Sequence, residues 1–124
     1  MANQGFHEDP NLLSESTKDY HRIIESTMEE LEAIDWYNQR AEAATDPAAK
    51  AIMEHNRDEE IEHACMGLEW LRRNSPVWDA MMQKFLFSSG DIVVQESAVA
   101  DQTTQTDTPP ATPSSGTLKI GSNS

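Results

Sequence analysis

The sequence predicts an all-α fold, in which two long helices form an antiparallel hairpin and a short third helix follows. Residues 11–43 contain no glycine or proline and are rich in Glu, Ala and Leu, which favour helices. Helix start signals then occur at Asp46-Pro47 and at Ser75-Pro76. In both, the first residue can cap a helix and the proline suits its first turn.

The first predicted helix, residues 11–43, carries an apolar stripe with one carboxylate, Glu30, at its centre. At helical spacing, apolar side chains surround this carboxylate on the same face. They are Ile23, Ile34, Tyr37 and Ala41. The opposite face is mostly acidic, so this helix is amphipathic and Glu30 lies on its inner side.

The second predicted helix spans about 47–73, and Glu60 lies on its inner stripe. The connection between the two long helices is short, which predicts that they run antiparallel as a hairpin. A third helix is predicted over 76–87, since Ser88-Ser89-Gly90 ends the helical pattern.

The remaining segments divide the chain into a domain with two tails. The N-terminal tail is polar and has no helical period, so we expect it to be mobile. A long stretch after the domain is rich in Ser, Thr, Asp, Gln and Pro and lacks aromatic residues, which is typical of a disordered linker. Two apolar side chains return near the end, which indicates either a docking peptide or a tail without function. The predicted boundaries are 1–10, 11–94, 95–116 and 117–124.

Composition restricts the partners of the chain. With 22 acidic and 9 basic residues, the net charge is -13. Nucleic acid is excluded as a partner, because binding phosphates requires a basic face, whereas cations suit this surface. No apolar run approaches the roughly 20 residues of a membrane span. The single cysteine cannot form an internal disulfide, which is compatible with a reducing cytoplasm.

Glu60 and His63 have the spacing of metal ligands, because residues three apart share one helix face. A buried carboxylate costs several kcal/mol unless a cation compensates it, which exceeds the roughly 1.5–3 kcal/mol gained by burying a leucine. Glu30 occupies a matching inner position on the preceding helix. Carboxylates with an imidazole suit iron or manganese. The alternative is that Glu-x-x-His occurs by chance on acidic helices.

The number of candidate ligands suggests half of a larger site. A di-iron carboxylate bundle takes four helices, with two single glutamates and two Glu-x-x-His pairs. This chain offers one of each, namely Glu30 and the pair of Glu60 and His63. A complete site therefore needs two subunits about a two-fold axis, so that dimerisation completes a four-helix bundle.

Three blocks of sequence carry a resemblance to a known family. They are Met-Glu-Glu-Leu-Glu-Ala-Ile-Asp-Trp-Tyr at 28–37, His-Asn-Arg-Asp-Glu-Glu-Ile-Glu-His-Ala at 55–64 and Leu-Glu-Trp-Leu-Arg-Arg at 68–73. In this order they resemble the encapsulated ferritins of bacteria, over about residues 11–94. The segment Leu-Lys-Ile-Gly-Ser at 118–122 resembles the peptide that loads cargo into encapsulin shells. Lys119 departs from the small or polar residue often found at its position.

The resemblance implies a half-ferritin hairpin whose homodimers assemble into a ring, a decamer in this family. It also implies a ferroxidase that oxidises Fe(II) with dioxygen at a di-iron centre between subunits. The implied ligands are Glu30, Glu60 and His63, with Tyr37 beside the centre.

A second set of residues is implied to form an outer site for Ca²⁺ or another divalent cation: Glu29, Glu32 and Trp36. From the residues alone, an ordinary solvated acidic face explains them equally well. The resemblance further implies that residues 117–122 bind an encapsulin shell protein, and that iron mineralises inside this cytoplasmic nanocompartment. Two other functions stay open, a non-enzymatic iron or manganese buffer and a purely structural shell cargo adaptor.

Overall fold

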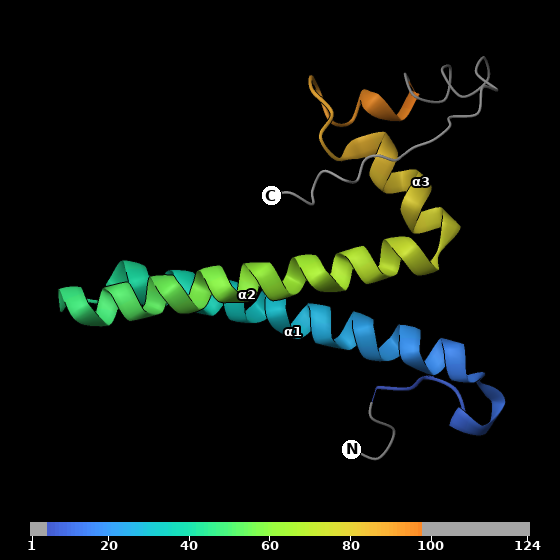
Figure 1. Ribbon diagram of the computed structural model, residues 1–124, viewed down its shortest axis with the longest axis horizontal. Coiled ribbons are helices and arrows are strands. Elements are labelled where there is room, and N and C mark those ends of the chain that lie inside the picture. Colours follow the sequence, from blue (N-terminus) through green and yellow to red (C-terminus); the bar gives the residue numbers. More distant parts are fainter. Residues whose placement is uncertain (1–4, 98–124) are drawn as a thin grey trace, which may run out of the picture. The chain divides into compact units, whose positions relative to one another are not determined.

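The computed structural model describes residues 5–97, and within this range the chain is helical without any strand. Figure 1 shows the elements in chain order. A short 3-10 helix, η1, spans Pro10–Leu12, and three α-helices follow. They are α1 (Glu15–Ala43), α2 (Pro47–Asn74) and α3 (Pro76–Phe85). The predicted all-α class is confirmed. The tail 117–124 and most of the predicted linker lie outside the described residues.

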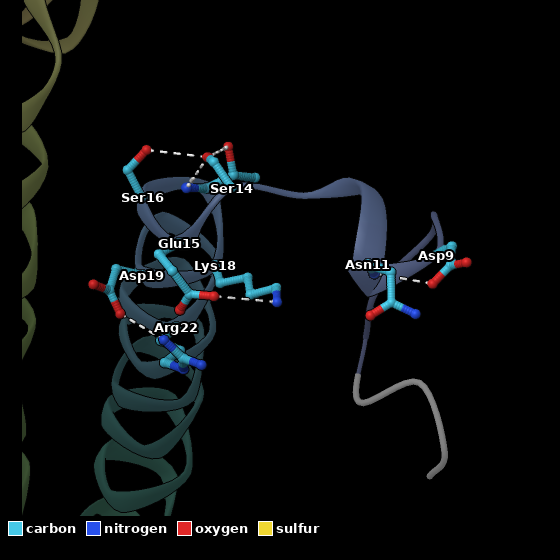
Figure 2. A network of polar contacts seen from close by, with 9 residues as sticks. Asp9, Asn11, Ser14, Glu15, Ser16, Lys18, Asp19 and Arg22 are labelled. Carbon is cyan, nitrogen blue, oxygen red and sulfur yellow. Dashed lines mark hydrogen bonds and ion pairs between the residues drawn. The ribbon is translucent and has the colours of Figure 1, made fainter.

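The first long helix begins at Glu15, later than the expected residue 11. Asp9 and Pro10 start a separate 3-10 turn, in which Asp9 Oδ1 accepts a hydrogen bond from the Asn11 amide at 2.9 Å. Ser14 then caps α1 by accepting from the Thr17 amide at 3.1 Å. Figure 2 shows both caps and the side-chain contacts around the start of α1. The helix starts late because this local hydroxyl cap satisfies its first amides.

The residues before this cap contact α1. The Phe6 ring lies 4.6 Å from the His21 ring, measured between centroids. A Cβ built on Gly5, which has a φ of +85°, would lie 3.2 Å from a carboxylate oxygen of Glu25. Residues 5–9 therefore lie against α1 in this structure, whereas residues 1–4 of the predicted N-terminal tail lie outside the described range.

The predicted antiparallel hairpin is confirmed, and Figure 1 shows α1 and α2 side by side. Asp46 caps α2 by accepting from the Ala49 amide at 2.9 Å, and Pro47 is the first helical residue. Across the connection, Lys50 Nζ donates to the carbonyl oxygen of Ala41 at 3.2 Å. The short, capped connection fixes which faces of the two helices meet.

A network of charged side chains holds the corner between α2 and the start of α3. Arg72 donates to Glu69 at 2.7 Å and to Asp79 at 2.8 Å. Hydrogen bonds from Arg72 and then Arg73 lower the pKa of Glu69 to about 2. The Arg72 guanidinium therefore joins the end of α2 to the first turn of α3.

The third helix ends at Phe85, two residues before the predicted position. Phe87 adopts a φ of 62°, the left-handed conformation with which helices commonly end. Its side chain is fully exposed. The apolar pattern extends the prediction to residue 87, but the backbone has already left the helix there.

The core of the hairpin is small. Of the apolar side chains in residues 5–97, only those of Ala41, Ala64 and Leu71 are buried. Larger apolar side chains of α1 and α2 stay 43–59% exposed. These are Met28, Leu31, Ile52, Ile61 and Met66. Across the described range, no helix is both long and apolar enough to cross a membrane.

Candidate metal centre

Glu30, Glu60 and His63 converge on one point of the hairpin. His63 Nδ1 lies 3.3 Å from Glu60 Oε1 and 3.7 Å from Glu30 Oε1. One ligand atom from each residue lies within 4.8 Å of the other two. No second group of this kind occurs within residues 5–97. Helical spacing places Glu60 beside His63 on α2, and the antiparallel packing of α1 brings Glu30 to them.

The cluster is half-buried in the single chain. The side chains of Glu30, Glu60 and His63 are 28%, 25% and 41% exposed. Glu30 and His63 also line a groove of about 330 Å³ whose walls include Thr27, Gly67 and Trp70. The open side leaves room for ligand atoms from outside this chain.

Protons are shared unequally within the cluster. A hydrogen bond with Glu60, and then burial, raise the pKa of Glu30. The same hydrogen bond lowers the pKa of Glu60, which accepts it as the carboxylate. Hydrogen bonding to Glu60 raises the pKa of His63. The metal-free cluster therefore favours protons at Glu30 and His63 more than free side chains would, and a cation competes with those protons for the same atoms.

The donor set fits a transition metal of intermediate hardness. Two carboxylates supply oxygen and one imidazole supplies nitrogen, a combination that suits iron or manganese. Three side chains leave coordination positions free on any ion of higher coordination number. The residues present could therefore hold iron, with further ligands supplied from outside this chain.

Of the other predicted site residues, Glu29 and Glu32 are not among the acidic and histidine side chains that converge here, and the role of Tyr37 beside the centre stays a prediction. Tyr37 is half-buried, and the Arg40 guanidinium lies 5.2 Å from its ring centroid. Glu29 and Glu32 are exposed, and Trp36 is 48% exposed with Arg40 at 6.0 Å from its ring. The outer cation site therefore stays a prediction.

Sequence reasoning missed three residues near these sites. Arg40 contacts two of the predicted site residues, and Thr27 and Gly67 line the groove beside the cluster. A signal for Gly67 was present, because a glycine inside a helix usually has a packing or functional reason. Arg40 follows Trp36 by four residues and Tyr37 by three, so helical spacing could have indicated both contacts.

Residues 5–89 match the model of a protein family described as EncFtn-like. The chain belongs to the EncFtn-like family. It is 51% identical to the encapsulated ferritin-like protein of Rhodospirillum rubrum over 98 residues, which cover 79% of this chain and 70% of that protein. A ferritin-like protein of Thermotoga maritima is 47% identical over 92 residues, covering 74% and 80% of the respective chains.

A solved structure supports the same family. The crystal structure of protein NE0167 from Nitrosomonas europaea aligns with a TM-score of 0.69 at 51% identity. The alignment covers 71% of this chain and 97% of that one. Membership of the EncFtn-like family gives the chain a ferritin-like, iron-related function, and the Glu30–Glu60–His63 cluster is compatible with it.

Proposed function

We propose that this protein is a ferroxidase whose di-iron centre is shared between two copies of the chain. The observation that carries the proposal is the cluster of Glu30, Glu60 and His63, a three-ligand set with an open side. A second copy about a two-fold axis would supply the same three ligands again. The six side chains then match the four glutamates and two histidines of a di-iron carboxylate bundle.

The ligand residues have separate roles in the proposed reaction. Glu30 and Glu60 would hold the iron and neutralise its charge, and His63 would supply a nitrogen ligand. Bound iron would supply the one-electron redox chemistry, with dioxygen as the proposed oxidant. Since the metal carries out the redox step, the protein contributes geometry, charge and access.

The exposed apolar side chains of α1 and α2 support the shared centre. Leu31, Ile61 and Met66 lie on the same two helices as the ligands and are 43–59% exposed, and Met66 lines the groove that holds Glu30 and His63. Covering them with a second copy would remove apolar surface from water and close the open side of the cluster. We propose that such homodimers assemble further into a ring, as the family resemblance implies.

The proposed location is inside an encapsulin shell. A relative at 51% identity is called an encapsulated ferritin-like protein, and residues 117–122 resemble the loading peptide of such cargo. A hairpin of this size has no storage cavity of its own, so oxidised iron would mineralise within the shell.

Anaerobic addition of Fe(II) followed by air tests the proposal against its alternatives. The expected result is continued oxidation beyond two irons per shared centre. Uptake that stops at a fixed stoichiometry would instead identify an iron or manganese buffer. If the protein takes up no iron, the result would favour a structural cargo adaptor.

A further inference from the structure

Thr27 on α1 and Gly67 on α2 lie in direct contact beside the metal cluster. A Cβ built on Gly67 would collide with Thr27 Oγ1 and would lie 3.4 Å from Thr27 Cβ. Thr27 is 6% exposed, and among the described residues its Oγ1 has no hydrogen-bond partner. Only a hydrogen atom at position 67 leaves room for the hydroxyl where it stands.

This contact contains two features that disfavour folding. Glycine inside a helix is less stable than alanine, and a buried hydroxyl without a partner is less stable than an apolar group of the same shape. Local conflicts of this kind are expected at functional sites. The close contact therefore calls for a role other than stabilising the hairpin.

The position of the contact indicates that role. Thr27 precedes Glu30 by three residues on α1, and Gly67 follows His63 by four on α2. Each partner is thus one turn from a metal ligand on its own helix. All four residues, Thr27, Glu30, His63 and Gly67, line the same groove. A change in the separation of α1 and α2 at this contact must move Glu30 relative to His63.

We infer that the contact between Thr27 and Gly67 is a spacer that sets the size of the ion held by Glu30, Glu60 and His63. Both are positioning residues, since neither offers a ligand atom to the cluster. Small divalent ions bind oxygen and nitrogen at about 2.0–2.2 Å, whereas Ca²⁺ takes ligands at about 2.3–2.6 Å. A closely set pair of helices favours the smaller ions. The inference rests on the proposed function only in taking iron as the natural ion.

A double-mutant cycle tests the spacer with the full-length protein and redox-inert probes. The variants are Gly67→Ala, Thr27→Ala and both together, and calorimetry measures the affinities for Zn²⁺ and Ca²⁺. We expect Gly67→Ala to lower the Zn²⁺ affinity about tenfold or more, as changes around a metal site commonly do, and the Ca²⁺ affinity less. The double variant should regain most of the loss, because without Oγ1 the new Cβ meets only the residue-27 Cβ at 3.4 Å.

Cys65→Ala is the matched control, because Cys65 is exposed on the same helix. It should leave both affinities unchanged. The melting temperature of the metal-free protein is a separate readout. A helical Gly→Ala change normally raises it, so a fall in Gly67→Ala reports the collision. Should Gly67→Ala not fold, Thr27→Val tests the same contact, since a methyl group larger than Oγ1 would face Gly67. It should lower the Zn²⁺ affinity without lowering the melting temperature.

Two results would overturn the inference. One is a Zn²⁺ affinity of Gly67→Ala equal to that of the wild type. If Thr27→Val is used instead, the same result for that variant counts. It would mean that the side chain of residue 27 rotates away and that α1 and α2 keep their separation. The other is a loss that the double variant does not regain. Iron oxidation by the wild type is measured separately. If the Zn²⁺ affinities of the variants change as expected but the wild type does not oxidise iron, the ferroxidase proposal is rejected and the spacer inference is kept.

Discussion

Glu30 Oε1 on α1 lies 3.7 Å from His63 Nδ1 on α2. This contact joins the two helices of the hairpin at the metal cluster. Glu60 and His63 are neighbours on any helix, but Glu30 reaches them only when α1 and α2 meet in this register. A metal site in this protein therefore depends on the tertiary fold.

Replacing any cluster residue with alanine should abolish iron oxidation. In a two-fold site, Glu30→Ala, Glu60→Ala and His63→Ala each remove two ligands at once. We expect the initial rate of Fe(III) formation to fall by more than about 100-fold, beyond the effect of changing outer partners alone. Glu62→Ala removes one exposed charge from the same helix and should keep the wild-type rate. Wild-type oxidation by Glu60→Ala would reject the ligand assignment.

Metal affinity should fall as the pH falls. The pKa values of Glu30 and His63 are raised, so the metal-free protein keeps these protons to a higher pH than free side chains would. A metal competes with these protons, so its affinity should fall as the pH drops. Anaerobic Fe(II) titrations between about pH 5.5 and 8 measure this fall. His55→Ala, on the exposed side of α2, should show the same profile as the wild type, and a flat profile would contradict the prediction.

Iron should strengthen association of the chains. A cation that binds only between two copies stabilises the dimer by mass action. For each iron that binds between the copies at a free concentration about 100 times its dissociation constant, the dissociation constant of the dimer should fall about 100-fold. Sedimentation velocity without oxygen, with and without Fe(II), measures the change. His63→Ala should associate equally in both conditions. A protein that stays monomeric while oxidising iron would contradict a shared centre.

Glu29 and Glu32 should affect the delivery of iron rather than its oxidation. Both are exposed on the outer face of α1, where carboxylates attract cations. The double variant Glu29→Gln/Glu32→Gln should take up iron more slowly at low salt and approach the wild type at high salt. Stopped-flow absorbance follows the uptake. The control Glu8→Gln/Glu42→Gln removes the same charge elsewhere, and equal slowing in both doubles would show only the effect of net charge.

Deleting residues 117–124 should abolish loading into an encapsulin shell without changing oxidation by the free protein. Leu118 and Ile120 are two residues apart, so in an extended segment both can face one surface. If residues 95–116 form the linker that their composition predicts, they would span on the order of 25 Å, enough for the tail to reach a shell wall. Co-expression with the shell, followed by particle purification, measures the cargo. A variant with Leu118 and Ile120 changed to Ser keeps the length of the chain and should also fail to load. If either variant loads into the shell, the segment that directs loading lies elsewhere in the chain.

Much of the fold followed from local signals in the sequence. Asp46 and Pro47 predicted the start of α2, and the structure confirms both the cap and the first helical residue. The start of α1 did not follow, because the helix-favouring composition extends back to residue 11 while the Ser14 hydroxyl cap sets the actual start. Composition reports a propensity, whereas the first residue of a helix depends on which side chain satisfies the free amides.

The candidate site was predictable to a similar degree. Spacing alone paired Glu60 with His63, and the apolar surroundings of Glu30 indicated its inward face. The contact between Thr27 and Gly67 was not predictable, because it depends on the exact register and separation of two helices. The same limit applies to burial, since Leu31 and Ile61 are apolar and lie on the two helices that carry the cluster yet stay 53% and 43% exposed.

The small core of the hairpin affects how the protein would persist in a cell. With only Ala41, Ala64 and Leu71 as buried apolar side chains in the described range, one copy has little to hold its helices together. A newly made copy without a partner would open often, and cellular proteases act on open chains. Paired copies would survive, so the amount of protein should rise more steeply than its rate of synthesis. Degradation of unpaired copies would then keep incomplete centres from accumulating.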